Sequence, residues 1–302
     1  MNYINTMKNN YFSLVLRASL IALIFVSSVF YSHVYAQLSF PQSQLDLNGQ
    51  GTFTSGITSL TYGPDGKLYA TEYTGLVHVM TIERDGPNDY KVTSMETLTG
   101  VQGIQNHNDD GSNNSLTQRE TTGLAVAGTS ANPVIYVASS DIRVGGQTTG
   151  QGDTNLDTNS GTITRFYWNG SSWDVADLVR GLPRSEENHA TNGLEFVTIG
   201  GTDYLIVAQG GNANGGSPSI NFALLGEYAL SAAILAIDLT AIEAMSDKLD
   251  NGRVYKYNLP TLDDPSRPNA NGVNDPSAPG YNGIDVNDPF GGNDGLNQAK
   301  VV

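Results

Sequence analysis

The chain has 302 residues, of which 39% are hydrophobic and 15% are charged. Such a chain can bury a substantial apolar core, which excludes a charge-rich disordered tail. Its formal net charge of −15 at pH 7 disfavours binding to nucleic acid or anionic lipid, because these also carry negative charge, and favours the attraction of cations.

The first residues have the features of a secretory signal peptide. Lys8 and Arg17 are basic, Leu20 to Phe30 is an apolar run, and Val34-Tyr35-Ala36 offers small residues for cleavage. The run is shorter than the ~20 residues that span a bilayer, which favours a cleaved signal over a membrane anchor. We expect residues 1–36 to be removed, and the mature chain to be secreted, extracellular or periplasmic, with no membrane insertion. Cleavage changes the formal charge from −15 to −17, and the cysteine-free chain has no disulfide framework.

Short apolar stretches separated by Gly, Asn, Asp and Pro follow, a pattern typical of an all-β protein. They fall into three groups, each of which predicts one four-stranded antiparallel sheet. The expected strands are Ile57 to Tyr62, Lys67 to Glu72, Leu76 to Glu83, Tyr90 to Leu98, Gly123 to Ala127, Val134 to Ser139, Thr162 to Trp168, Trp173 to Val179, Gly193 to Ile199, Tyr204 to Ala208, Ala232 to Leu239 and Arg253 to Asn258.

The three groups repeat at a regular distance. Leu60, Leu124 and Leu194 occupy equivalent positions, 64 and 70 residues apart. Compact propeller repeats have ~40–50 residues, and the excess here lies in long polar insertions between strands. The spacing predicts β-propeller blades over residues 37–262, with their first strands side by side and a site carried by loops on one face. A β-sandwich with irregular loops is the alternative.

Two segments depart from the strand pattern. Asp238 to Met245 lacks turn residues, which predicts a short helix after Leu239. Residues 263–302 are rich in Pro, Asn, Asp and Gly, and we expect a loop followed by the start of another blade. Because three blades cannot close a ring and an open blade edge invites aggregation, we expect the chain to be an N-terminal fragment. The alternative is a complete chain whose last segment pairs elsewhere.

His189 is the best candidate for proton chemistry near neutral pH, because the chain has four histidines and no cysteine. It stands between a polar loop and an apolar strand start, within Gly181 to Phe196. The alternative is an imidazole that only hydrogen-bonds neighbouring backbone at the entry to a strand. His78, on an alternating strand, is predicted to be structural, and His107 to be a solvated loop residue.

Asp153, Asn155, Asp157 and Asn159 alternate along the chain and predict a calcium loop, because calcium favours six to eight oxygen ligands. Thr158 replaces the usual Gly of such a loop, and Thr164 replaces the closing Glu. A polar turn that caps its own backbone is the alternative. The acidic stretch Asn282 to Gly295 suits a solvated linker better than a second calcium site. Tyr167, Trp168 and Trp173 can stack on sugar faces, or can pack against each other across a hairpin.

The His189 segment resembles the catalytic-histidine segment of soluble quinoprotein glucose dehydrogenases and the wider glucose/sorbosone dehydrogenase-like propellers. Gly63-Pro64-Asp65-Gly66-Lys67-Leu68-Tyr69 is similar to a strand-turn-strand phrase of propeller blades. The resemblance covers Ile57 to Leu239 and implies a six-bladed propeller that holds pyrroloquinoline quinone and calcium over its channel. It also implies that His189 takes the proton of a sugar or alcohol hydroxyl while hydride passes to the quinone.

The cofactor contacts that this resemblance implies fall on Arg119, Asn192 and Gln209, and each stands in a phrase that departs from the family. Asn192 precedes Gly193 where the family has Gly followed by Arg. Gln209 lies in Val-Ala-Gln-Gly-Gly where the family has Gly-Asp-Gln-Gly, and the entry after Arg119 lacks the usual Gly-Gly-Leu form. These departures all fall in the motifs that bind the cofactor in the family.

Ser139-Ser140-Asp141-Ile142-Arg143 and Asp153 to Gly161, followed by the His189 phrase, resemble more closely the uncharacterised secreted bacterial propellers of this superfamily. Those proteins often carry further carbohydrate-binding or adhesion-type domains in one chain. The resemblance therefore implies either a quinone-dependent sugar or alcohol dehydrogenase, or a non-catalytic propeller that binds glycans or displays partner domains. A lactonase-like calcium hydrolase is disfavoured, because no clustered Glu, Asn and Asp set is evident.

Overall fold

The computed structural model describes residues 42–108, 111–144, 156–187, 189–211, 227, 230–259, 271–275 and 277–281. The chain divides into two compact units, Met1–Ser43 and Gln44–Val302, and the description below concerns the second. The predicted signal peptide lies outside the described residues. No helix in the described parts of the chain has the length and apolar character of a membrane span.

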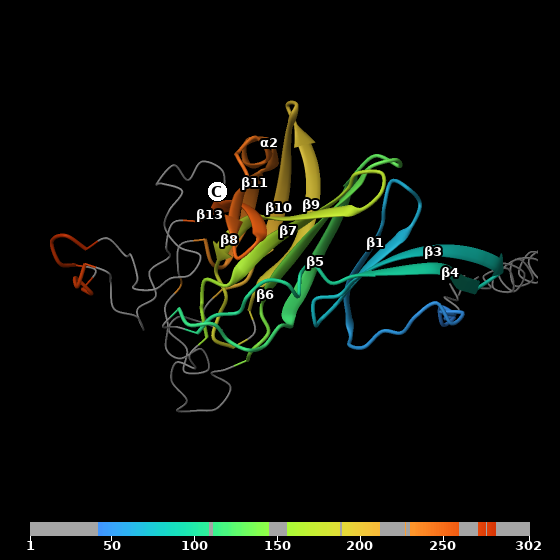
Figure 1. Ribbon diagram of the computed structural model, residues 1–302, viewed down its shortest axis with the longest axis horizontal. Helices are drawn as coiled ribbons and strands as arrows, with labels where there is room; N and C mark the ends of the chain where they lie inside the picture. Colours follow the sequence, from blue (N-terminus) through green and yellow to red (C-terminus); the bar gives the residue numbers. More distant parts are fainter. Residues whose placement is uncertain are drawn as a thin grey trace, which may run out of the picture. The chain divides into compact units, whose positions relative to one another are not determined.

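The described residues of the second unit are all-β apart from one short helix, and their strands form three sheets rather than the two of a sandwich (Figure 1). The first sheet has the order β1-β2-β3-β4, the second β12-β13-β8-β7-β6-β5, and the third β11-β10-β9. The elements are β1 (Ile57–Tyr62), β2 (Leu68–Glu72), β3 (Val77–Gly86), β4 (Asp89–Leu98), β5 (Arg119–Gly128), β6 (Pro133–Asp141), β7 (Gly161–Trp168), β8 (Trp173–Leu182), β9 (Thr191–Ile199), β10 (Thr202–Gln209), β11 (Ala233–Asp238), α2 (Leu239–Glu243), β12 (Lys248–Asp250) and β13 (Arg253–Asn258).

The predicted strands are confirmed within a few residues, and all pairings within the groups of four are antiparallel for the first eight strands. The helix predicted after Leu239 is also present. It begins where the side chain of Asp238 accepts a hydrogen bond from Ala241 N at 2.8 Å, as an N-cap does.

The predicted pairing partner of the strand Arg253 to Asn258 is wrong. The strand was expected to complete the third sheet, but β13 pairs in parallel with β8, which makes the second sheet mixed. The cause is charge pairing. Arg253 makes two bonds of 2.6 Å to the buried carboxylate of Asp177 on β8, and Arg180 of β8 donates to Asn258 Oδ1 at 2.8 Å. The guanidinium of Arg180 also stacks on the Tyr255 ring, 3.8 Å from its centroid.

The first strands of the three groups lie side by side, as predicted, because β5 contacts both β1 and β9 (Figure 1). Gly123 of β5 permits the contact with β9. A Cβ on this residue would lie 2.1 Å from the carbonyl oxygen of Asn192, closer than a real Cβ approaches. One residue earlier, Thr122 Oγ1 donates to Thr191 O at 2.6 Å. The two strands therefore meet backbone to backbone.

Two apolar clusters fill the spaces between the sheets. In the first, side chains of the first sheet such as Tyr69 and Val77 pack with Ile135 and Phe166 of the second sheet. In the other, residues of the second and third sheets pack together in the same way, among them Ile163, Val179, Leu205 and Ile237. Burial between sheets thus supplies the stabilisation that a cysteine-free chain cannot draw from disulfides.

Glu72 lies fully buried on β2, and its carboxylate holds the segment that precedes β1. Its Oε2 accepts from Thr54 Oγ1 and from Ser55 N, each at 2.7 Å, and its Oε1 lies 2.7 Å from Nε2 of His78. The other ring nitrogen of His78 lies 3.0 Å from Thr97 Oγ1, which confirms the structural role predicted for this histidine. Burial acts to raise the pKa of Glu72, but the hydrogen bonds outweigh it and lower the pKa to about 2.

We expect Glu72→Gln to lower the free energy of unfolding by on the order of 3 kcal/mol at pH 7, since the folded-state pKa of about 2 lies well below the ordinary 4.5. The folded state favours the ionised carboxylate, so this stabilisation is present above pH 4.5 and is lost as the pH falls towards 2. Urea unfolding of both proteins between pH 7 and pH 2.5 measures the difference. A difference that stays constant over this range contradicts the prediction.

Gly123→Ala should destabilise the protein by about 1–3 kcal/mol, because the added methyl group meets backbone that cannot yield without moving β9. Gly193→Ala on β9 is the matched control, since a Cβ there meets nothing within 4 Å. Denaturant midpoints of the two variants measure the effect. Equal midpoints for both variants would show that β5 and β9 do not meet in this way.

Candidate functional site

The candidate site lies at one edge of the second and third sheets, which we call the loop edge. Because neighbouring strands are antiparallel, β5, β7 and β9 begin here, and β6, β8 and β10 end here. The long connections between β4 and β5, β6 and β7, and β10 and β11 also start and end at this edge. The predicted site residues Arg119, Asp157, Asn159, His189, Asn192 and Gln209 all lie on it.

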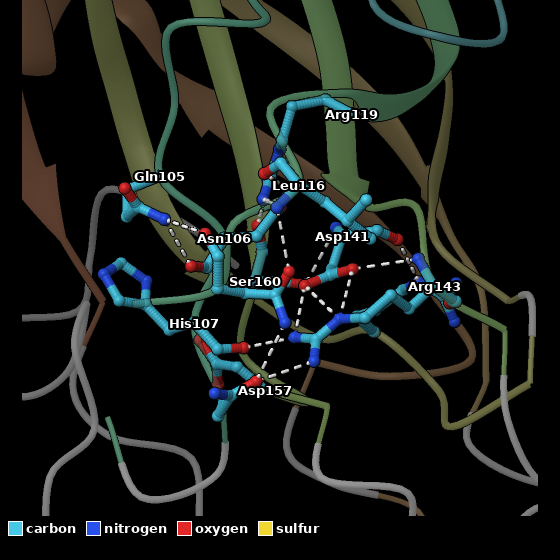
Figure 2. A network of polar contacts seen from close by, with 12 residues as sticks. Gln105, Asn106, His107, Leu116, Arg119, Asp141, Arg143, Asp157 and Ser160 are labelled. Atoms are coloured by element: carbon cyan, nitrogen blue, oxygen red, sulfur yellow. Dashed lines mark hydrogen bonds and ion pairs between the residues drawn. The ribbon is translucent and has the colours of Figure 1, made fainter. Parts of the chain in front are cut away.

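Arg119, the first residue of β5, is fully buried at the loop edge (Figure 2). Its guanidinium donates to Asn106 Oδ1 at 2.7 Å and to the carbonyl oxygen of Ser160, in front of β7. Asn106 in turn donates to the carbonyl oxygens of Leu116 and Gln118. Burial lowers the pKa of Arg119 to about 10, so the group is still charged at neutral pH. Arg119 therefore ties the β4–β5 connection to the second sheet.

Arg143 carries a second set of contacts at the same edge (Figure 2). Its Nη2 lies 2.7 Å from Asp141 Oδ2, its Nη1 donates to Asn108 Oδ1 at 2.8 Å, and Nη2 also contacts the carbonyl oxygen of His107. His107 is partly buried rather than solvated, which corrects the sequence prediction, and burial lowers the pKa of its ring.

Arg184, two residues after β8, is a third buried or partly buried cation of the loop edge. It is fully buried, and its guanidinium donates to the carbonyl oxygens of Asp141, Arg143 and Ser185. The same group lies 3.1 Å from Glu120 Oε2 on β5. Burial raises the pKa of Glu120, and the neighbouring Arg184 opposes that rise. The pair therefore joins β5, the end of β6 and the β8–β9 loop.

His189 is partly exposed in the loop between β8 and β9. Its backbone closes a turn with Ser185, because Ser185 N donates to His189 O and His189 N donates to Ser185 Oγ, each at 2.8 Å. Its Nδ1 lies 3.1 Å from Gly211 O. A carbonyl oxygen only accepts, so Nδ1 carries the proton and the lone pair of the neutral ring is on Nε2. Gly210 permits this approach, since a Cβ there would lie 3.0 Å from His189 Cβ.

Gln209 and Asn192 use their polar atoms within the protein. Gln209 Nε2 donates to Pro183 O at 2.8 Å, and its Oε1 accepts from Thr191 Oγ1 at 2.9 Å. Asn192 Nδ2 donates to Ala190 O at 3.1 Å. Both side chains thus fix the backbone on either side of His189. Their contact with a cofactor, like that of Arg119, stays a prediction.

The predicted calcium loop is described only in part, because Asp153 and Asn155 lie outside the described residues. Asp157 and Asn159 are buried, and Asp157 Oδ1 accepts from Asn159 N at 3.0 Å, as in a turn that caps its own backbone. Thr164 lies on β7, where its hydroxyl donates to Asp177 at 3.0 Å. Within the described ranges, no three His, Cys, Asp or Glu side chains are placed to hold one metal ion.

Sequence reasoning missed the roles of Arg184, Glu120 and Arg143. A usable signal was the position of each charge directly beside a strand terminus, where the alternation of apolar residues predicts burial. Tyr73 was missed as well. It lies beyond the end of β2, its carbonyl oxygen accepts from Thr121 N, and burial together with Glu120 raises the pKa of its hydroxyl.

Comparison with known proteins gives few matches. The chain matches no known protein family and no curated protein. Among solved structures, it is similar to the iodide structure and the calcium structure of Trichoderma reesei Carbohydrate-Active Enzymes Family AA12, with TM-scores of 0.39 and 0.41 and 17% identity to each. The likeness covers 63% and 68% of this chain but only 37% and 41% of those chains. No functional conclusion follows at TM-scores this low.

Arg184→Met should cost about 3–5 kcal/mol of stability, because it leaves Glu120 buried without its cation. The folded-state pKa of Glu120, already above the ordinary value, should rise further, so the variant should become more stable as the pH falls from 7 to 5. The double variant with Glu120→Gln should lose this pH dependence and cost less than the two single changes together.

Urea unfolding of the single and double variants measures both effects. Arg165→Met is the control, because its pair with Glu243 is partly exposed and should contribute about 0–1 kcal/mol. Strict additivity of the Arg184 and Glu120 changes would show that the pair is not coupled.

Proposed function

We propose that the loop edge binds a sugar or another alcohol, and that His189 takes the proton of one substrate hydroxyl as general base. The reaction class is oxidation of that hydroxyl. The observation that carries the proposal is the hydrogen bond from His189 Nδ1 to Gly211 O, because it sets the tautomer that a base requires. His189 is partly exposed, as a residue that meets substrate must be.

The surroundings of His189 support this role by fixing its position. Ser185 holds its backbone from one side, and Gln209 and Thr191 hold the strands on the other. A base held by packed strands loses little freedom when substrate binds, which favours proton transfer in a defined geometry. When the ring accepts the proton, the carbonyl oxygen of Gly211 stabilises the resulting imidazolium.

The resemblance to glucose/sorbosone dehydrogenase-like propellers adds pyrroloquinoline quinone as hydride acceptor and calcium as its partner ion. The residues expected to hold the quinone do not fit that role in the described geometry. Arg119 and Gln209 are buried, and Arg119 Nη1, Gln209 Nε2 and Asn192 Nδ2 each donate to the protein itself. We therefore derive no step through the quinone.

The same proposal includes a propeller architecture and secretion. Adjacent first strands with sheets packed face to face are what blades around a channel require. The outer faces of the first and third sheets expose large apolar side chains, including Leu60, Tyr62 and Ile234, as a face that packs on a neighbouring blade does. Secretion rests on the sequence of residues 1–36.

A second candidate function is glycan binding without catalysis. The observation that favours it is the internal pairing of the loop edge, where Arg119, Arg184 and Gln209 all serve the fold. In that case His189 only hydrogen-bonds its neighbours. Activity of the wild-type protein separates the two candidates.

In the proposed reaction, His189→Ala should lower the rate of dye reduction with an aldose by 10²–10⁴-fold, since that is what general-base assistance typically contributes. The assay uses the full chain supplied with pyrroloquinoline quinone and calcium. Binding of the sugar, measured by calorimetry, should change little. Glu195→Ala, exposed on β9, is the control and should keep full activity.

Two outcomes contradict the proposal. A wild-type protein that binds sugars but oxidises none of a broad panel favours glycan binding. An active protein in which His189→Ala costs less than about tenfold removes His189 from the chemistry.

A further inference from the structure

A polar hollow lies away from the loop edge, among the tight hairpin turns at the other end of the sheets. It is small and partly open to solvent. Its lining comes from the β1–β2 turn, the β5–β6 turn, the β7–β8 hairpin and one side chain of β4. The lining side chains that can recognise a ligand are Asp65, Lys67, Glu96, Trp168 and Trp173.

The two tryptophans form the aromatic part of the hollow. They are directly paired across the β7–β8 hairpin, with ring centroids 5.3 Å apart and planes tilted by 58°. Trp173 Nε1 donates to Glu96 Oε2 at 3.2 Å, which fixes that ring against the first sheet. The hairpin itself is stiff, because the side chain of Asn169 accepts from the backbone of Ser171 and Ser172. The aromatic faces are therefore preorganised.

The charged part of the hollow holds acceptors and a donor close together. Asp65 accepts from Tyr69 Oη at 3.0 Å and lies 3.6 Å from Lys67 Nζ. The Lys67 side chain is 45% exposed, so its ammonium can also reach a ligand. Two carboxylates disfavour an anion, and the lysine disfavours a cation. A neutral molecule with many hydroxyl groups suits the carboxylates and the lysine alike, since a hydroxyl group can donate to the former and accept from the latter.

The two indole rings favour a ligand that also carries apolar C–H groups. The face of an indole ring carries partial negative charge, which attracts the weakly positive C–H groups of a sugar ring. The hollow is small and partly open to solvent, so a single sugar ring would lie partly in it and partly in solvent.

We propose that this hollow is a binding site for one neutral sugar residue of a glycan, separate from the loop edge. Trp168 and Trp173 stack on the sugar, Glu96 and Asp65 accept from its hydroxyls, and Lys67 donates to them. The site works by binding alone and is independent of the chemistry proposed for His189.

The chain offers a direct readout, because Trp168 and Trp173 are its only two tryptophans. Their fluorescence in the full chain therefore reports on this hollow alone. Titration with glucose, N-acetylglucosamine, cellobiose and maltose should give a saturable change in emission with at least one of them, and calorimetry should give the same Kd.

Lys67→Met and Glu96→Gln keep both tryptophans and should weaken binding at least fivefold. Trp168→Ala, followed by calorimetry, should abolish it. Tyr167→Phe is the matched control, because this exposed neighbour on β7 does not line the hollow. Its Kd should equal that of the wild type.

Three results overturn the proposal. The first is no saturable change with any of the four sugars. The second is a sugar Kd that Lys67→Met and Glu96→Gln leave unchanged. The third is saturation by choline but not by the sugars, which would make the hollow a cation site.

Discussion

The buried guanidinium of Arg184 is the interaction on which the loop edge depends. It joins three backbone carbonyl groups and the carboxylate of Glu120, which come from β5, the end of β6 and the loop after β8. A buried charge is tolerated only when it is paired and fully hydrogen-bonded. None of these segments can move without leaving a buried polar group unpaired. The turn that carries His189 follows directly on Ser185, so its position depends on the same cation.

The close approach of neighbouring backbone segments is a second constraint, because it leaves no room for a side chain. Gly123 lets the backbone of β9 lie against β5, and Gly210 lets the end of β10 lie against His189. Each glycine matters because the neighbouring atoms belong to backbone or to Cβ, which cannot turn aside as the end of a long side chain can. Together with Arg184, they make the geometry of the edge a property of backbone packing rather than of flexible side chains.

The sequence predicts the strands well because alternation of apolar and polar residues is a local property. The partner of β13 is not local. It depends on Arg253 meeting Asp177, 76 positions earlier, and on Arg180 meeting Asn258. The same limit applies to the site. His189 stands out in the sequence, but Arg119 and Gln209 were expected to face a cofactor, whereas their bonds to Ser160 and Pro183 arise only when the sheets pack.

The two ends of the sheets differ in the length of the connections between their strands. Connections at the loop edge are long, such as the one between Leu98 and Arg119, and they need buried cations to fix them. Turns at the other end are short, so Trp168 and Trp173 are fixed by strand pairing, and Trp173 also by its bond to Glu96. Long loops can gather groups from several strands around one reacting atom, whereas a hairpin offers a small rigid surface. This difference agrees with the proposed proton transfer at the first end and the proposed recognition without chemistry at the second.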